Sequence, residues 1–278
     1  MKRVCDQIAA VLIGGFVLLV VADVVVPVLY AVAMSIDPRP YIGPFPPPGI
    51  SFRWYRQFFG DDRYMRALGT SLALAFTAGF VSTVLGTLAA LGLSHAPGRR
   101  RALAGGMFSM PQLVPHVVLG FALLLTLAAA GWGGGFLALL CAHGIITLPY
   151  VVRSVGAALV GLRPSLIEAA MSLGATRAQA TWDIILPLTR TGIVVGFVFA
   201  LAVSLDEVAA SVFLTVPGTT TLPVMLFSDM AASFDLTIAA AAAVMMGLCL
   251  ASVLVLDRLV GLERLLGGGT YGTLQTER

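Results

Sequence analysis

Two adjacent carboxylates, Asp206 and Glu207, are the side chains best suited to chemistry in this sequence, and they stand in an apolar stretch with Ser204. The stretch predicts a membrane-spanning helix, in which neighbouring residues point about 100° apart. At most one carboxylate can therefore face a central cavity. Carboxylates at membrane depth are costly unless they are paired, protonated or in contact with water. They would either attract a cationic solute or complete a gate, or they would make hydrogen bonds that hold helices together.

Three further polar residues interrupt apolar segments. Asp23 lies in the first apolar run and presents the same choice between a transport role and a bond to a neighbouring helix. His116 and His143 are expected to donate hydrogen bonds between helices, because no carboxylate or cysteine spacing suggests a metal site. The three cysteines are too far apart for a disulfide framework or a metal-ligand pattern. We therefore predict no catalytic residue and no metal.

A second informative segment reads SLIEAAMSLGATRAQATWDIILP. Ser165 followed three residues later by Glu168 predicts a capping box, and Gly174 can end that short helix in a left-handed turn. Thr176 repeats the capping pattern with a glutamine three residues later, and Pro187 is expected to disrupt the second helix. The pattern predicts a helix, a tight turn and another helix between two membrane spans.

The spacing of this segment resembles the EAA loop of permease subunits of binding-protein-dependent ABC importers with the MetI-like type I fold. The shared pattern is Glu168-Ala169-Ala170, three residues, Gly174, nine residues, and Ile184-x-Leu186-Pro187. The resemblance implies a coupling helix that docks on an ATP-hydrolysing subunit. The residues implied in this coupling are Ser165, Glu168, Ala169, Ala170, Gly174, Ile184, Leu186 and Pro187.

The stretch around Asp206 resembles the PotC-like permeases for spermidine and putrescine. The matching positions are Ser204, Asp206, Glu207, Thr221, Leu222 and Pro223. Polyamines carry several ammonium groups, so acidic side chains along the route would suit them. Permeases for iron, sulfate and phosphonates share much of the pattern, so these solutes stay open as alternatives. Ser204, Asp206, Glu207 and Asp23 are the candidate pathway or gate residues.

The composition agrees with a membrane protein. Of 278 residues, 58% are hydrophobic and 11% are charged, against about 25% charged in soluble domains. The basic residues lie at the ends of apolar runs and form no stripe with aromatic residues, which argues against nucleic-acid binding. The sequence also lacks the G-x-x-x-x-G-K-[ST] phosphate loop, so we expect no bound nucleotide or other cofactor.

The apolar runs predict six transmembrane helices. Their expected ranges are 8–33, 67–93, 103–130, 136–159, 191–216 and 236–256. The first run is longer than the ~7–15 apolar residues of a signal peptide, so it is expected to stay attached. Pro111 and Pro115 should bend or break the third span. With both termini in the cytoplasm, twelve of the 17 basic residues face inward, in agreement with the positive-inside rule.

Four regions follow from these expectations. Residues 1–35 form the first helix, and residues 36–66 form a proline-rich periplasmic loop with an amphipathic segment on the membrane surface. Residues 67–257 form a five-helix core that includes the coupling loop 160–190, and residues 258–278 form a cytoplasmic tail. The amphipathic segment would anchor the chain to lipid or dock a partner. The prolines depart from the family pattern and leave the contact with a binding protein open.

The resemblance also implies an assembly in the bacterial inner membrane. One such bundle supplies half of a solute pathway. The expected partners are a related but distinct second permease chain, two ATP-binding subunits and a periplasmic solute-binding protein. A secondary transporter is the main alternative, but it should show inverted repeats, and none is visible. An intramembrane enzyme would need a nucleophile or metal constellation that the sequence lacks.

Overall fold

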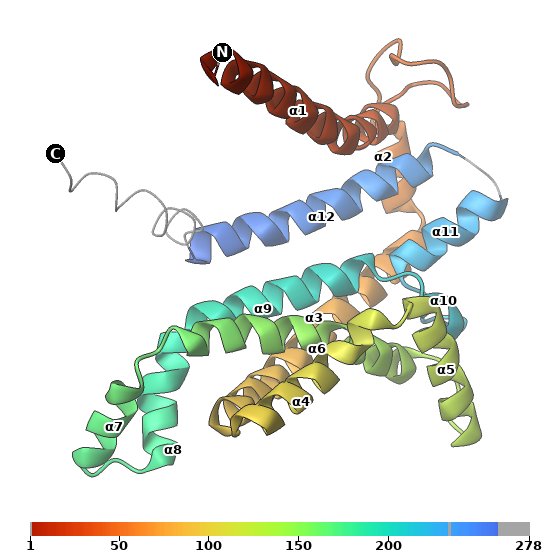
Figure 1. Cartoon of the computed structure of the whole chain (residues 1–278). Helices are drawn as coiled ribbons and strands as arrows, with labels where there is room; N and C mark the ends of the chain where they lie inside the picture. The colour runs from red at the N-terminus through yellow and green to blue at the C-terminus, as the bar shows by residue number, and fades with distance from the viewer. Residues whose placement is uncertain (1, 233–234, 261–278) are drawn as a thin grey trace. The chain divides into compact units, whose positions relative to one another are not determined.

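The computed structural model describes residues 2–232 and 235–260, and all regular secondary structure within them is helical (Figure 1). The elements are α1 (Lys2–Ser35), α2 (Arg53–Gly60), α3 (Asp62–His95), α4 (Gly98–Ser109), η1 (Met110–Leu113), α5 (His116–Ala129), α6 (Phe136–Val160), α7 (Pro164–Ser172), α8 (Arg177–Ala180), η2 (Thr181–Ile185), α9 (Leu186–Asp206), α10 (Ser211–Leu214), α11 (Leu222–Ala232) and α12 (Thr237–Val260). The predicted all-α fold class is confirmed.

Within residues 2–232 and 235–260, five helical stretches are long and apolar enough to cross a membrane. They are Ala10–Ser35, Asp62–His95, Phe136–Val160, Arg177–Asp206 and Thr237–Arg258. A sixth span is possible where Gly98–Leu113 and His116–Ala129 meet at an angle of 98°. Proline cannot donate the helical backbone hydrogen bond, so Pro111 in η1 and Pro115 before α5 explain the break. The predicted bend in the third span is confirmed.

The fifth span differs from its predicted range. Helical backbone begins at Arg177 and passes through the π-helical turn η2 into α9, so Pro187 does not disrupt it and that prediction is wrong. Proline is tolerated in the first turn of a helix, where its missing N–H leaves no bond unmade, and the wider π turn precedes it. The span also ends early, because Glu207 is extended (φ −76°, ψ 111°). The two carboxylates therefore stand at the end of the helix and not within it.

Contacts divide the chain into two units. One comprises the residues up to Met65 together with Leu226–Gly247. Its core contains Met34, Trp54, Leu236 and Ala240. The proline-rich loop is fastened to this core, since the Trp54 indole donates a hydrogen bond to the Asp37 carbonyl at 2.7 Å. The expected amphipathic segment is confirmed as a helix, α2, which buries Trp54 and Phe58.

The second unit comprises Arg66–Met225 and the described residues from Leu248 to Val260. Helices α6 and α9 lie side by side along their length (Figure 1). Gly192 permits this approach, because a Cβ there would lie 2.7 Å from the Ala158 Cβ and 2.8 Å from the Ser154 carbonyl oxygen. The Ser154 hydroxyl donates to the Gly192 carbonyl at 2.8 Å. Small residues thus give close backbone packing and a hydrogen bond, which replace the hydrophobic effect between helices in lipid.

Many large apolar side chains point away from the protein. Leu12 and Leu18 on α1 are 67% and 72% exposed, and no residue of the most apolar window of that span is buried. A soluble protein rarely exposes continuous apolar surface of this size. The outer faces of these helices are therefore suited to lipid or to other membrane-embedded chains.

Candidate functional site

The capped loop begins with α7, which ends in a left-handed turn at Gly174. The backbone φ of Gly174 is +93°, a value that side chains with a Cβ rarely adopt. The Gly174 N–H donates to the Met171 carbonyl and the Ala175 N–H donates to the Ala170 carbonyl, each at 3.0 Å. These two bonds form a Schellman motif, which satisfies carbonyls left free at a helix end. The predicted turn at Gly174 is confirmed.

The first capping box does not form. Helix α7 starts at Pro164, its N-cap is Arg163, and no side chain caps it. Ser165 therefore lies inside the helix, two residues past the N-cap position, and the predicted pairing with Glu168 is wrong. A proline in the first helical turn fixes the backbone angle and removes one N–H that would need a partner. Pro164 therefore favours the start of α7 at this position without a side-chain cap.

The second capping box is present. The Thr176 hydroxyl accepts from the Gln179 N–H at 3.2 Å, and the Gln179 side-chain oxygen accepts from the Thr176 N–H at 2.8 Å. Both reciprocal bonds hold the start of α8 directly after the turn. The two short helices thus form a fixed hairpin between the end of α6 and the start of α9 (Figure 1).

The coupling residues inferred from the resemblance have unequal exposure. Glu168, Ala169, Gly174 and Pro187 are exposed, whereas Ala170, Ile184 and Leu186 are half-buried. The Glu168 side chain is exposed, and its backbone carbonyl accepts from the Ser172 hydroxyl at 2.9 Å. The loop therefore presents small and charged side chains on its surface together with large apolar ones, of which Leu173 is 89% and Trp182 is 69% exposed.

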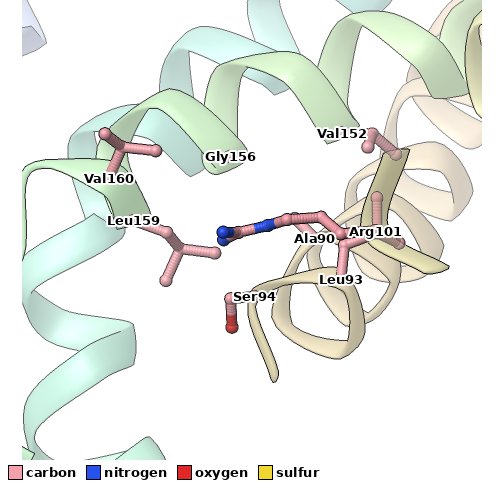
Figure 2. A pocket seen from close by; sticks show the side chains of 8 residues that line it. All are labelled: Ala90, Leu93, Ser94, Arg101, Val152, Gly156, Leu159 and Val160. Carbon is pink, nitrogen blue, oxygen red and sulfur yellow. The ribbon is translucent and has the colours of Figure 1, made fainter. Parts of the chain in front are cut away.

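Two hollows open beside the root of this loop. The smaller, of about 210 Å³, lies between α3, α4 and α6, and Figure 2 shows the Arg101 side chain reaching into it toward Leu159 and Ser94. The larger, of about 390 Å³, also includes Ile167 of α7 and Ile185 of η2. No local sequence pattern indicates these hollows, because residues from five separate elements, α3, α4, α6, α7 and η2, line them.

The second site surrounds Glu207, which is 6% exposed. Its Oε2 lies 2.5 Å from Nδ1 of His116, and its Oε1 accepts from the Ala210 N–H at 2.8 Å. Gly120 allows α5 to approach this turn, because a Cβ there would lie 2.6 Å from the Ala210 Cα. A carboxylate partnered on both oxygens can stay buried at membrane depth. Glu207 therefore fastens the end of α9 to the start of α5.

His143 extends the polar network of Glu207 and His116 through two serine hydroxyls. Its Nδ1 lies 2.7 Å from the Ser204 hydroxyl, and its Nε2 lies 2.9 Å from the Ser211 hydroxyl. The Ser211 hydroxyl in turn donates to the Glu207 carbonyl at 3.0 Å. A neutral imidazole can donate from one nitrogen and accept at the other, so two hydroxyls satisfy it without a charge. The predicted hydrogen-bonding role of both intramembrane histidines is confirmed.

The four predicted pathway residues separate in the structure. Ser204 and Glu207 are buried in the network, whereas Asp206 is exposed at the end of α9 and Asp23 is exposed on α1. The predicted divergence of the adjacent carboxylates is confirmed, but its cause is the end of the helix. Ser211 was missed, because only the turn after Glu207 brings it to His143. Its place four residues after Glu207 offered a weak signal.

Comparisons with known proteins place these sites in a family. The family model described as binding-protein-dependent transport system inner membrane component matches residues 82–262. The chain belongs to this family. It is the permease subunit of an ABC importer. The match includes both the capped loop and the Glu207 network.

Curated relatives cover most of this permease. The spermidine/putrescine transport system permease protein PotC of Haemophilus influenzae is 31% identical over 247 residues, 89% of this chain and 95% of its own. The putrescine transport system permease protein PotI of Escherichia coli is 36% identical over 207 residues, 72% of this chain and 73% of its own. The resemblance drawn from the two sequence motifs is confirmed.

A solved structure confirms the fold. The permease superimposes on a chain of a bacterial ABC transporter involved in the import of the acidic polysaccharide alginate with a TM-score of 0.71. The alignment covers 94% of this chain and 98% of that chain at 18% identity. Similarity at this level of identity concerns the arrangement of the helices, and the type I importer fold predicted from the capped loop is confirmed.

Proposed function

We propose that this permease forms half of a polyamine pathway and that ATP hydrolysis by partner subunits drives uptake through its capped loop. The choice of solute rests on the two relatives, which are permeases of spermidine/putrescine and putrescine transport systems and align over most of the chain. The acidic end of α9 supports it, because Asp206 leaves a carboxylate exposed beside the buried Glu207. An exposed carboxylate at the end of a membrane helix favours a cationic solute over an anion such as sulfate.

The rigid hairpin supports a coupling role for the loop. The Schellman turn at Gly174 and the capping box at Thr176 hold α7 and α8 in one geometry, so a push on α7 would reach α9. Ala169 on the exposed face allows a partner to approach closely. The hollow beside Ile167 lies between the loop and the ends of α3 and α6. This space gives the loop room to shift when the ATPase subunits close.

The proposed assembly contains two ATP-binding subunits, a related second permease chain and a periplasmic solute-binding protein. The distribution of basic residues supports cytoplasmic termini and a cytoplasmic capped loop. Asp23 and Asp206 would meet the second permease or the water-filled pathway, because both are exposed on this chain. Catalysis of ATP hydrolysis belongs to the partner chains.

Reconstituted vesicles test the proposal. The permease and its partner chains would be reconstituted into vesicles loaded with ATP. Uptake of labelled putrescine would then be measured, with spermidine and sulfate as unlabelled competitors. We expect uptake that requires ATP, is competed by spermidine and is unaffected by sulfate. Uptake driven by a sodium or proton gradient without ATP would contradict the coupling. Competition by sulfate alone would contradict the polyamine solute.

Crosslinking tests the docking contact directly. In a background without native cysteines, Ala169→Cys should crosslink to an ATPase subunit that carries cysteines around its docking groove. Ala130→Cys is the matched control. Ala130 is also exposed, but it follows α5 in a turn that the proposed topology places on the periplasmic side of the membrane. Crosslinks from Ala130→Cys and none from Ala169→Cys would reverse the proposed orientation.

A further inference from the structure

A polar hollow of about 220 Å³ lies in the unit that contains α2 and the start of α12. Its polar lining includes Asp61, Arg63, Tyr64, Asp229, Asp235 and Thr237. These side chains come from the α2–α3 turn, the start of α3, the end of α11 and the start of α12. Its lining shares no residue with the capped loop or with the Glu207 network, and neither role proposed above uses it.

The charge of this hollow is negative. Three carboxylates face one guanidinium, and Arg63 is already engaged, since its Nη2 lies 2.8 Å from the Asp61 Oδ2. Asp229 and Asp235 therefore contribute two uncompensated negative charges. A concave site lined by one sign of charge concentrates counter-ions of the opposite sign.

Each of these two carboxylates uses one oxygen and keeps the other available. The Asp229 Oδ2 accepts from the Tyr64 hydroxyl at 2.6 Å, and the Asp235 Oδ1 accepts from the Thr237 N–H at 2.7 Å. These bonds hold the carboxylates in place. The second oxygen of each has no hydrogen bond from residues 2–232 or 235–260. Both can accept from a ligand in the hollow.

Thr237 is the independent sign that a ligand belongs there. Its side chain lines the hollow and is 1% exposed, yet its Oγ1 has no hydrogen-bond partner among the residues described. A buried hydroxyl without a partner costs about 1–3 kcal/mol, and such groups are rare in folded proteins. A donor placed in the hollow would remove this cost.

The geometry favours an organic cation over a metal ion. Within the described part of the chain, no three His, Cys, Asp or Glu side chains converge closely enough to hold a metal. An alkylammonium group carries up to three N–H donors on one nitrogen and can reach separated acceptors. Ala232 and Ile238 add apolar surface for the attached methylene chain.

We propose that this hollow binds a terminal ammonium group of an aliphatic amine, which donates to Asp229, Asp235 and the Thr237 hydroxyl. The inference rests on the proposed polyamine function and adds a site to it. In the proposed orientation the starts of α3 and α12 lie at the periplasmic surface, so an incoming amine can enter this hollow from the periplasm.

Thiol-reagent accessibility tests the site in the complete importer. Ala232→Cys places a thiol at the exposed rim, in a background without native cysteines. Two membrane-impermeant methanethiosulfonates of similar size would be compared, one bearing a quaternary ammonium and one a sulfonate. We expect the cationic reagent to react about tenfold faster from the periplasmic side, and putrescine to slow it more than sodium chloride of equal ionic strength.

Second substitutions in that background locate the effect. Asp229→Asn and Asp235→Asn should each reduce the ratio of the two rates, and Thr237→Val should raise the protecting putrescine concentration about tenfold. Asp62→Asn is the matched control, because Asp62 is exposed at the same end of α3 and does not line the hollow. It removes the same charge and should leave the ratio nearly unchanged.

The outcomes separate this inference from the proposed function. Equal rates for both reagents without putrescine protection, in an importer that transports putrescine, would overturn the amine site and leave the function intact. Protection by magnesium as strong as that by putrescine would also overturn it. Putrescine protection in an importer that fails to transport putrescine would support the amine site and overturn the proposed solute.

Discussion

Glu207 and His116 are 91 positions apart in the sequence, and their Oε2 and Nδ1 atoms lie 2.5 Å apart in the structure. The contact joins the residue after the end of α9 to the first residue of α5, which begins after the break at Pro115. A push on the capped loop enters α9 at one end, and this pair lies at the other. The relationship gives the permease a physical link between its proposed motor contact and the acidic end of α9.

Glu207→Ala should reduce the stability of the assembled permease, whereas Asp206→Asn should reduce only cation transport. The alanine leaves the buried Ala210 N–H without its acceptor, at about 1–3 kcal/mol. Glu207→Gln keeps that acceptor and should be intermediate in stability. Thermal unfolding of the purified complex and putrescine uptake separate the two effects. Poor assembly of Asp206→Asn with normal transport would contradict the assignment.

Gly174→Asp should insert normally and lose stimulated ATPase activity. The aspartate must adopt φ near +93° and places a charge on the exposed turn, which strains the backbone by about 1–2 kcal/mol. Gly161→Ala is the control in the same loop, because its φ of −73° suits any residue. The ATPase rate of the complete importer, with and without binding protein, is the measurement. Normal stimulation in Gly174→Asp would remove the coupling role.

Thr176→Val should loosen the start of α8, and Ser165→Ala should leave the start of α7 unchanged. The first change removes a capping hydroxyl worth about 1 kcal/mol, whereas Ser165 makes no capping bond. Amide hydrogen exchange of residues 177–180 and 165–168 reports each helix start separately. Faster exchange at α7 in Ser165→Ala would show that the capping box predicted from the sequence forms after all.

Gly120→Ala should destabilise the packing of α5, and Gly144→Ala should not. A Cβ at Gly120 would lie 2.6 Å from both the Cα and the carbonyl oxygen of Ala210, which are backbone atoms that cannot rotate away. Nothing lies within 4 Å of a Cβ at Gly144, so alanine there should stabilise α6 slightly. Melting temperatures of the two variants should therefore shift in opposite directions.

The proline-rich loop should lose part of its anchorage at low pH. The side-chain hydrogen bond from Arg39 holds the pKa of the Asp37 carboxyl below its ordinary value. The resulting stabilisation is complete above the ordinary pKa and disappears as the pH falls through the lowered one. Asp37→Asn should therefore be cleaved faster in this loop than wild type at neutral pH. The difference should vanish in acid, where pepsin should cleave the loops of the two proteins at the same rate.

Arg39→Gln provides the matched control for this pH dependence. It removes the other half of the same ion pair, so it should raise loop cleavage at neutral pH as Asp37→Asn does. The double variant should show no additional increase, because residues that act through one contact are not additive. Additive effects would show that the two side chains act through different partners.

The amino-acid sequence determined the class of this protein, its helical spans and the turn of its capped loop. Periods of apolar residues reveal spans because lipid offers no partner for backbone polar groups, and Gly174 reveals its turn because few other residues tolerate its φ. Short-range capping was half correct: Thr176 caps its helix, but α7 starts at Pro164, so Ser165 lies two residues past the N-cap and cannot reach a free N–H as a cap.

Only the tertiary structure decided which polar residues meet. Asp206 and Glu207 are equivalent in sequence, yet one is exposed and the other is paired with His116 because α9 ends between them. The same holds for Thr237 and Asp229, which share a hollow through a fold that joins separate helices. A side chain's own type sets what bonds it can make, but partners far away in the chain are chosen by the packing of helices, for which a local pattern carries no signal.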